Sequence, residues 1–234
     1  MNMNVKLFAD GADKAGMLEM YNNPIISGFT TNPTLMKMAG VENYSGFAKE
    51  ILSYIDDKPI SFEVFSDDLL EMEKQALEIS SWGKNVNVKI PITNTKGDPC
   101  DKLIKNLSDV GVKINVTAMM TIKQVELVLP SLSAGVGGYV SVFAGRITDA
   151  GNDPLPVMEK VLRLLDETSN VELIWASPRE LYNVVQANSI GCHIITATNN
   201  ILKKLPTIGK DLDQFSLETV KMFYDDAQEA GYTI

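Results

Sequence analysis

The sequence is short of the side chains from which metal sites and disulfide frameworks are usually built. Its 234 residues include one histidine, His193, and two cysteines, Cys100 and Cys192. Because a metal site of the common His/Cys type needs several such ligands, we expect no metal ion. The two distant cysteines are typical of a protein that stays reduced in the cytoplasm. His193 falls in the apolar run 192–195, so we expect a core residue rather than a catalyst.

Positive charge and long apolar runs are also scarce. The 21 basic residues are outnumbered by 30 acidic ones, and the net charge of -9 argues against nucleic acid as a partner. No apolar run approaches the roughly 20 residues of a membrane-spanning helix, and Met1–Asp10 lacks the apolar core of a secretion signal. We therefore expect a cytoplasmic protein with no membrane partner. An anionic substrate would need a local group of basic side chains.

A dinucleotide-binding fingerprint is missing as well, because no Gly-x-Gly-x-x-Gly follows the first predicted strand. What the chain does contain is an alternation of short β-branched runs with helical patterns. The predicted strands are 5–9, 25–29, 60–65, 86–91, 112–118, 139–143, 171–176 and 191–196. The predicted helices are 13–21, 33–39, 41–55, 67–80, 98–107, 121–129, 154–165, 179–188 and a short one at Ile201.

Strict alternation of strands and helices implies parallel pairing with right-handed crossovers. Eight such strands predict an α/β protein built as a single closed (β/α)8 TIM barrel. A doubly wound open sheet is the alternative. We expect one domain over 1–234, with the barrel at about 1–205 and an extra C-terminal helix at about 213–230.

A lysine interrupts one of the predicted strands. Apolar residues at 86, 88 and 90 indicate a buried strand, yet Lys89 lies among them. A buried ammonium group without a partner is costly. Burial generally lowers the pKa of a lysine, which makes its amine nucleophilic at neutral pH. Lys89 is therefore either an edge-strand residue whose amine reaches water or a Schiff-base lysine inside a barrel.

Further polar side chains fall in or just after the predicted strands. In a barrel the carboxyl ends of the strands meet at one mouth, where active sites lie. Each residue alone has an ordinary explanation, such as a helix cap, but together they predict a site at that mouth. They are Asp10, Thr30, Asn32, Glu63, Asn115, Thr117, Ser141, Arg146, Ser177 and Arg179.

These residue types suggest carbonyl chemistry. A desolvated lysine condenses with a ketone to an imine, which accepts electrons while a carbon–carbon bond breaks. Such a site needs one carboxylate for the substrate hydroxyl proton and a second acid/base for imine formation, and Asp10 and Glu63 are the candidates. Arg146 and Arg179, with Ser177, are suited to hold a phosphate.

Six short motifs, in order, resemble those of the transaldolases. They are Phe8–Asp10, Gly28–Pro33, Val88–Pro91, Asn115–Thr117, Ser141–Arg146 and Ser177–Arg179. The resemblance runs over most of the chain and is strongest to the short transaldolase and fructose-6-phosphate aldolase branch. It implies a (β/α)8 barrel and class I Schiff-base catalysis without a metal or organic cofactor.

The resemblance also implies roles for individual residues. Lys89 corresponds to the lysine that forms the imine with the ketose donor, and Asp10 to the aspartate that takes the proton of the donor's C4 hydroxyl. Glu63 and Thr117 correspond to the residues that hold a proton-shuttling water.

Substrate-binding roles follow in the same way. Asn32 and Ser141 match residues that contact the dihydroxyacetone unit, whereas Arg146, Ser177 and Arg179 match those that bind the acceptor's phosphate. The other residues that we count as substrate-binding are Thr30, Asn115 and Phe143.

The implied reaction moves a dihydroxyacetone unit from sedoheptulose 7-phosphate to glyceraldehyde 3-phosphate, in the non-oxidative pentose phosphate pathway. Sugar phosphates are then the small-molecule partners. The resemblance also implies a homo-oligomer, a pentamer or decamer, in which the C-terminal helix reaches a neighbour.

Two positions separate the branches of this family. Transaldolases resemble this chain in having Glu at 63 and Phe at 143, whereas the aldolase branch has Gln and Tyr there. That tyrosine helps water release the imine product, so Phe143 favours transfer to an aldehyde over release. A fructose-6-phosphate aldolase-type lyase or related sugar-phosphate aldolase is the alternative, and a non-catalytic sugar-phosphate-binding barrel is the second.

Three features depart from the family pattern. Gly11 follows Asp10 where Thr or Ser is usual, which predicts looser hydrogen bonding of the aspartate. The loop 93–98 is longer than usual, and Pro178 stands within Ser-x-Arg, where it is expected to stiffen the phosphate loop. These differences leave the preferred acceptor open.

Overall fold

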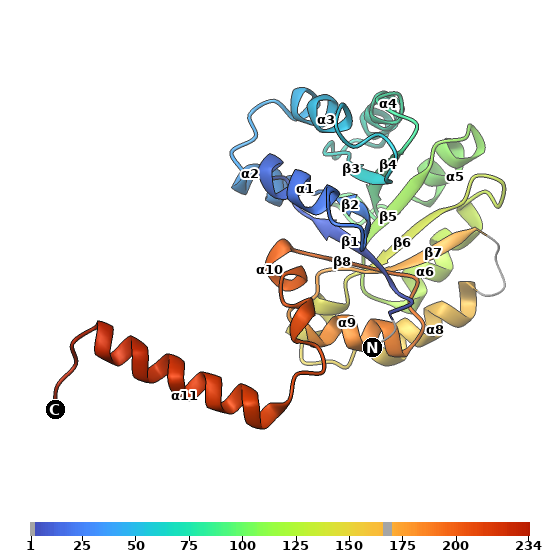
Figure 1. Ribbon diagram of the computed structural model, residues 1–234. Coiled ribbons are helices and arrows are strands. Elements are labelled where there is room, and N and C mark those ends of the chain that lie inside the picture. The colour runs from blue at the N-terminus through green and yellow to red at the C-terminus, as the bar shows by residue number, and fades with distance from the viewer. Residues whose placement is uncertain (1–2, 166–169) are drawn as a thin grey trace.

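The computed structural model describes residues 3–165 and 170–234. Met1 and Asn2, which belong to the stretch considered above for a secretion signal, lie outside the described residues. Eight parallel strands close into a barrel in sequence order, with β8 pairing back onto β1 (Figure 1). The predicted closed (β/α)8 barrel is confirmed, and the alternative of an open sheet is wrong.

The strands are short, and each is followed by helical structure. The strands are β1 Lys6–Asp10, β2 Ile26–Thr30, β3 Ile60–Glu63, β4 Val86–Pro91, β5 Ile114–Met119, β6 Gly138–Val142, β7 Val171–Trp175 and β8 Ile194–Ala197. The α-helices are α1 Lys14–Tyr21, α2 Pro33–Met38, α3 Tyr44–Leu52, α4 Leu69–Ser80, α5 Asp101–Asp109, α6 Ile122–Val128, α7 Ala144–Asp149, α8 Leu155–Leu165, α9 Tyr182–Ser189, α10 Asn199–Leu202 and α11 Leu212–Glu229. Two 3-10 helices are η1 Leu129–Ser131 and η2 Leu205–Thr207.

The predicted helix boundaries differ from the observed ones where a capping side chain decides. The helix expected from residue 41 begins instead after Asn43, whose side chain accepts a hydrogen bond from the Gly46 N–H. The C-terminal helix begins after Asp211, which caps it through the Gln214 N–H. Helix α7 was not predicted, because it has only six residues and contains Gly145.

Two apolar layers support the barrel. The larger one lies between the strands and the surrounding helices and includes Phe29, Phe62 and Trp175. The smaller one fills the barrel interior, where Phe8 and Tyr139 meet edge to face with their ring centroids 6.0 Å apart. Together these layers fix the strands whose ends carry the polar residues.

Strand register places polar side chains at matching heights inside the barrel. Asp10 of β1 pairs with Thr30 of β2, and Glu63 of β3 pairs with Lys89 of β4. Lys89 is also level with Asn115 of β5. Residues that are distant in sequence therefore come together at one level.

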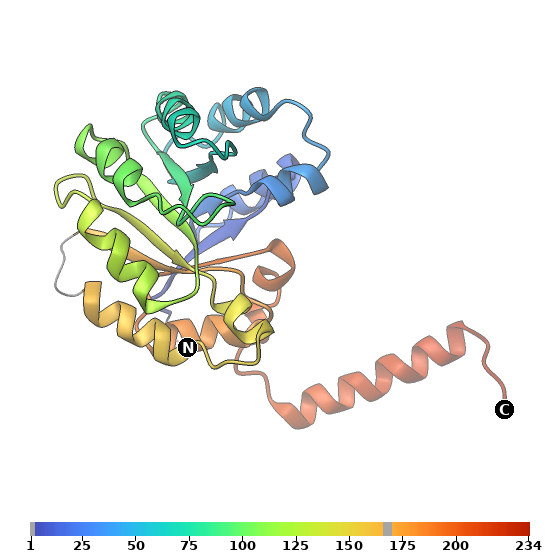
Figure 2. The same cartoon turned by 180° about the vertical axis from the view of Figure 1, so that it is seen from behind.

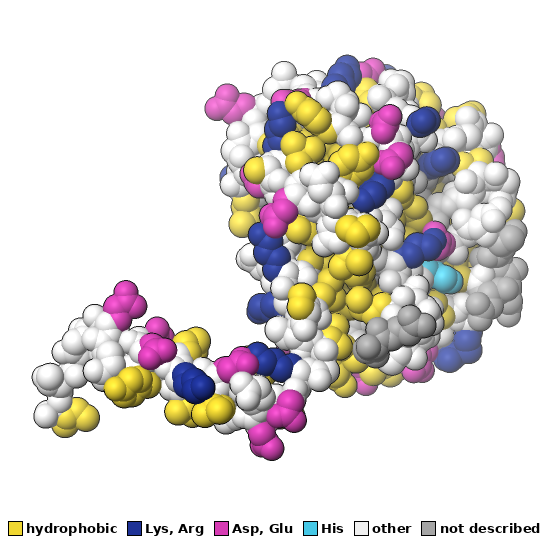
Figure 3. Space-filling view, viewed as in Figure 1, with side chains coloured by type: hydrophobic (Ala, Val, Ile, Leu, Met, Phe, Trp, Pro, Cys, Tyr) yellow, Lys and Arg dark blue, Asp and Glu magenta, His cyan; other side chains and the backbone are white. Residues whose placement is uncertain are grey.

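Helix α11 stands apart from the rest of the molecule. It points away from the barrel in both views (Figures 1 and 2), and none of its residues is buried. Exposed apolar side chains lie along it (Figure 3).

No helix among the described residues is long and apolar enough to cross a membrane.

Candidate active site

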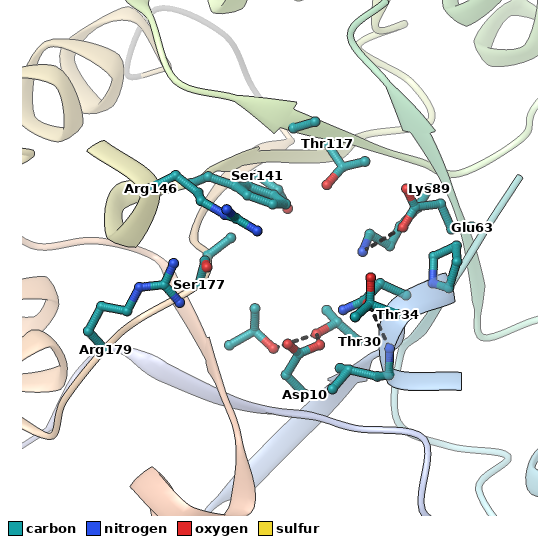
Figure 4. A pocket seen from close by; sticks show the side chains of 17 residues that line it. Asp10, Thr30, Thr34, Glu63, Lys89, Thr117, Ser141, Arg146, Ser177 and Arg179 are labelled. Atoms are coloured by element: carbon teal, nitrogen blue, oxygen red, sulfur yellow. Dashed lines mark hydrogen bonds and ion pairs between the residues drawn. The ribbon is translucent and has the colours of Figure 1, made fainter. Parts of the chain in front are cut away.

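A cavity of about 510 Å³ opens at the carboxyl ends of the strands. Of the twelve residues predicted for the site, Asn115 does not line it. The other eleven do (Figure 4), namely Asp10, Thr30, Asn32, Glu63, Lys89, Thr117, Ser141, Phe143, Arg146, Ser177 and Arg179. The cavity has two polar ends: Lys89 and Glu63 lie on one side, and Arg146, Ser177 and Arg179 lie on the other.

The amine of Lys89 is buried and paired. Lys89 is 5% exposed, although it belongs to the cavity wall. Its Nζ lies 3.1 Å from Oε2 of Glu63 and donates a hydrogen bond of 2.8 Å to the Thr31 carbonyl. This geometry excludes the edge-strand alternative, because β4 lies between β3 and β5 in a closed sheet. An amine held this way can exchange a proton with Glu63 and attack a carbonyl group in the cavity.

Glu63 is anchored by a tyrosine from outside the barrel. The pairing of β2 with β3 ends at Thr30 and Ser61, so it does not reach Glu63. The hydroxyl of Tyr44, the first residue of α3, fills this gap. It accepts from the Glu63 N–H at 2.8 Å and donates to the Glu63 carbonyl at 2.9 Å. Burial raises the pKa of Tyr44 well above its ordinary value, so its hydroxyl keeps its proton.

Asp10, at the end of β1, is the second carboxylate of the cavity. Thr30 donates a hydrogen bond of 2.6 Å to its Oδ1. Burial raises the pKa of Asp10 above 3.8, whereas the charge of Lys89 and the bond from Thr30 act in the opposite direction. A carboxylate with a raised pKa, facing a cavity, is suited to accept a proton from a substrate.

Thr117 presents an unused hydroxyl to the same cavity. The residue is 1% exposed, and its Oγ1 is buried without a hydrogen-bond partner among the described residues. Such a group carries an energetic penalty of about 1–3 kcal/mol until something bonds it. Its neighbour Ala118 adopts a positive φ of 63°, an unusual conformation for a non-glycine residue. Thr117 is therefore suited to bind a water molecule or substrate atom.

A buried network lies beside the cavity. Ser141 donates a 2.7 Å hydrogen bond to Oδ1 of Asn115, whose Nδ2 donates to Oγ of Ser61 at 3.1 Å. Asn115 is fully buried and contacts Ser141, and its role in substrate binding stays a prediction. It fixes the orientation of Ser141, which does line the cavity.

Asn32 and Phe143 each lie directly before a helix at the edge of the cavity. Asn32 caps α2 by accepting a hydrogen bond of 2.9 Å from the Leu35 N–H, which leaves its amide nitrogen for a ligand. Phe143 precedes α7 and presents an aromatic ring without a hydroxyl to the cavity.

The basic end of the cavity is assembled by close backbone packing. A Cβ on Gly145 would lie 1.6 Å from the Ser177 carbonyl oxygen, so α7 approaches the loop after β7 as only glycine allows. This contact brings Arg146 of α7 toward Ser177 and Arg179. Ser177 itself has a φ of 60°, directly before Pro178. Strained backbone of this kind is common at functional sites.

The two arginines differ in their partners. Arg179 donates from Nε to Oδ1 of Asp149 at 2.9 Å and from Nη2 to Oδ2, so one carboxylate occupies two edges of its guanidinium. Among the described residues Arg146 forms no ion pair. Both arginines face the cavity and are exposed enough to receive an anion.

Several residues of the site were missed by sequence reasoning. Tyr44 lies in a helix pattern, Thr196 looks like an ordinary strand residue, and Asp149 is the last residue of the unpredicted helix α7. Thr34 and Thr196 line the cavity. Only Thr196 carried a usable signal, because it falls at the end of the eighth predicted strand, like the other polar residues.

The remaining expectations concern residues away from the cavity. His193 accepts a hydrogen bond of 2.9 Å from the Leu173 N–H and is half-buried, as a structural residue would be.

Cys100 and Cys192 are free, and burial raises their thiol pKa values to about 11 and about 12. No cluster of possible metal ligands is found in the described part of the chain. The loop 93–98 is tied to Asp67, which accepts hydrogen bonds from Thr95.

Comparisons with known proteins agree with the motifs. A family model described as Transaldolase/Fructose-6-phosphate aldolase matches residues 7–234. A probable transaldolase of Thermoanaerobacter sp. (strain X514) is 34% identical over 232 residues, covering 98% of this chain and 100% of that protein. A probable transaldolase of Clostridium acetobutylicum is 35% identical over 203 residues, covering 86% of this chain and 89% of that protein.

Solved structures with low identity share the architecture. The crystal structure of KGPDC from Streptococcus mutans superposes with a TM-score of 0.58 at 14% sequence identity, covering 86% of this chain and 91% of that chain. At this identity the likeness concerns the fold alone.

Proposed function

Because this chain belongs to the transaldolase/fructose-6-phosphate aldolase family, we propose that it is a transaldolase that works through a Schiff base on Lys89. The donor is sedoheptulose 7-phosphate or fructose 6-phosphate, and the acceptor is glyceraldehyde 3-phosphate or erythrose 4-phosphate. The observation that carries this proposal is the buried amine of Lys89, paired with Glu63 in a cavity that Asp10 also lines.

The first step is imine formation. The neutral amine of Lys89 attacks the C2 ketone of the donor, and loss of water gives a protonated imine. Glu63 is within reach to take a proton from the ammonium and return one to the departing hydroxyl, with a water molecule on the free hydroxyl of Thr117.

The second step breaks the bond between C3 and C4. Asp10 takes the proton of the C4 hydroxyl, the carbonyl of the leaving aldehyde forms, and the electron pair of the broken bond moves into the imine. The product on Lys89 is an enamine of dihydroxyacetone, and Asp10 carries the proton. The acceptor aldehyde then enters, and the same steps run in reverse.

Substrate orientation is assigned to the other residues of the cavity. Asn32 and Ser141 hold the dihydroxyacetone unit, with Thr30 beside Asp10 and Asn115 behind Ser141. Arg146, Ser177 and Arg179 bind the terminal phosphate at the opposite end of the cavity. A substrate with a ketone at one end and a phosphate at the other matches these two ends.

A second candidate activity is cleavage without an acceptor, as in a fructose-6-phosphate aldolase. Phe143 argues against it, because its ring offers no hydroxyl to activate water for release of the imine. We therefore favour transfer.

A coupled assay tests the choice. With sedoheptulose 7-phosphate and glyceraldehyde 3-phosphate, the enzyme should form fructose 6-phosphate and erythrose 4-phosphate, with little free dihydroxyacetone when the acceptor is omitted. Release of free dihydroxyacetone at a similar rate would favour the lyase. Binding of sugar phosphates with neither activity would favour a non-catalytic barrel.

We further propose a homo-oligomer, a pentamer or decamer, whose subunits contact one another through α11. The helix projects from the barrel and exposes Val220 (61%), Met222 (50%) and Phe223 (63%). Multi-angle light scattering should give a mass of several chains for the wild type and a smaller mass for the Val220→Glu/Phe223→Glu variant.

The two free thiols support a place in the reducing cytoplasm, and the pentose phosphate pathway is the proposed context.

A further inference from the structure

A chain of hydroxyl groups leads from β8 to Asp10. Thr196 of β8 and Thr30 of β2 lie on either side of β1, and their Oγ1 atoms are 2.6 Å apart. Oγ1 of Thr30 is also 2.6 Å from Oδ1 of Asp10. The two threonines are 4% and 2% exposed, and both line the cavity. This series of hydroxyl groups therefore crosses the inner face of β1.

We propose that Thr196 is a positioning residue for Asp10 that acts through Thr30. This inference rests on the proposed function, in which Asp10 takes the proton of the substrate hydroxyl.

The number of hydroxyl protons sets the direction of these hydrogen bonds. A threonine hydroxyl has one proton to donate. Because Thr30 donates that proton to the Asp10 carboxylate, its contact with Thr196 requires Thr196 to be the donor. The bonds thus run from Thr196 to Thr30 to Asp10. Hydrogen bonds in series polarise one another, so the outer bond strengthens the inner one and limits rotation of the Thr30 hydroxyl.

Phe8 of β1 lies between the two strands that carry the threonines. Phe8 is in register with Thr196 on one side and with Gly28 on the other. Its ring lies against β2, since a Cβ on Gly28 would be 2.5 Å from its Cζ. By register, Thr196 is level with Phe8 and Thr30 is level with Asp10, so the contact between the two threonines links the level of the ring to that of the carboxylate. Valine would have nearly the same shape as threonine there, so the hydroxyl is the feature to test.

Several charged groups influence the ionisation of Asp10 besides these two hydroxyl groups. Lys89 from β4 favours the ionised carboxylate, whereas burial and Glu63 from β3 oppose it. Arg146 and Arg179 face the same cavity from α7 and from the segment after β7. The hydrogen bond of Thr30 favours ionisation. Weakening it should therefore raise the pH at which Asp10 becomes able to accept a proton.

The test compares Thr196→Val with the wild type in the full-length protein. Infrared difference titration follows protonation of the Asp10 carboxyl, assigned by subtracting spectra of Asp10→Asn. Loss of the outer hydrogen bond should move the Asp10 titration upward by about 0.5 pH unit, a factor of about three in the protonation constant. The acid limb of the pH profile of kcat should move upward by the same amount.

Two further variants separate positioning from mere packing. Thr196→Ser keeps the hydroxyl and should restore the wild-type titration. Ser108→Ala removes a buried hydroxyl that accepts from the Ser133 N–H at 2.8 Å, outside the cavity, and should leave the Asp10 titration unchanged. If Thr196→Val does not fold, Thr196→Ala provides the same comparison.

An unshifted Asp10 titration in Thr196→Val, or a shift that Thr196→Ser fails to reverse, would overturn the inference. Because the infrared measurement needs no turnover, its result is independent of whether the wild type catalyses transfer. Failure of the proposed function would instead appear as a wild type without transfer activity.

Discussion

Asp149 accepts two hydrogen bonds from the guanidinium of Arg179, so a protein carboxylate already occupies an arginine that we assign to phosphate binding. The pair lies at the edge of the cavity, with the two side chains 44% and 46% exposed. The bonds from Arg179 hold the pKa of Asp149 below its ordinary value, so Asp149 is ionised at neutral pH. A phosphate that reaches Arg179 therefore approaches a negative charge as well.

The first prediction follows for Asp149→Asn. An exposed ion pair contributes little to stability. The orientation that Arg179 loses should therefore matter less than the repulsion between Asp149 and the phosphate, which the substitution removes. We expect KM for glyceraldehyde 3-phosphate to fall about three-fold, with no change for unphosphorylated glyceraldehyde. Steady-state kinetics with both acceptors measures this. A higher KM for the phosphorylated acceptor alone would mean that Asp149 mainly orients Arg179.

The second prediction concerns Tyr44→Phe. Removing this hydroxyl leaves the N–H and the carbonyl of Glu63 without their present partner, which should lower the free energy of unfolding by about 1–3 kcal/mol. Glu63 should also shift relative to Lys89, so kcat should fall several-fold. Chemical denaturation and initial rates measure the two effects. Tyr139→Phe, in the apolar barrel interior, is the control and should keep kcat. Wild-type kcat in Tyr44→Phe would show that Glu63 is held without it.

The third prediction concerns Gly145→Ala. The added Cβ meets the Ser177 carbonyl oxygen, so α7 must move away from the loop after β7. We expect a loss of about 1–3 kcal/mol in unfolding free energy and a rise in KM for phosphorylated substrates. Gly135→Ala, where a Cβ has no atom within 4 Å, is the matched control. An unchanged KM in Gly145→Ala would separate this packing from phosphate binding.

The fourth prediction concerns Phe143→Tyr, which adds a hydroxyl to the cavity wall. A hydroxyl at this position can activate water for hydrolysis of the imine that we propose on Lys89. Release of free dihydroxyacetone without an acceptor should rise about ten-fold, below the usual contribution of a general acid/base. A colorimetric assay for dihydroxyacetone measures it. If release stays at the wild-type rate, Phe143 does not decide between transfer and cleavage.

The barrel and much of the cavity can be predicted from the sequence because both depend on local patterns. Short β-branched runs alternate with helical patterns, and Lys89 is visible as a charge at the buried positions of such a run. Register in a parallel barrel then brings strand ends together, which is why Asp10, Thr30 and Glu63 were found.

The residues that were missed act through contacts that no local pattern records. Tyr44 reaches Glu63 across 19 positions, and Asp149 reaches Arg179 across 30. Thr196 meets Thr30 across 166 positions and resembles any strand threonine. The place of Asn115 in a strand could likewise not reveal that Ser61 and Ser141 both form hydrogen bonds with its amide group.

The central claim is that Lys89 forms a Schiff base with the ketose donor, and trapping tests it most directly. The protein is incubated with fructose 6-phosphate, reduced with borohydride, digested and mapped by mass spectrometry, with Lys89→Arg as the control. We predict one modified peptide, 86–91 with its flanks, carrying a reduced dihydroxyacetone adduct on Lys89, and no adduct in the variant. An unmodified Lys89 in protein that catalyses transfer, or an adduct on another lysine, would contradict the account.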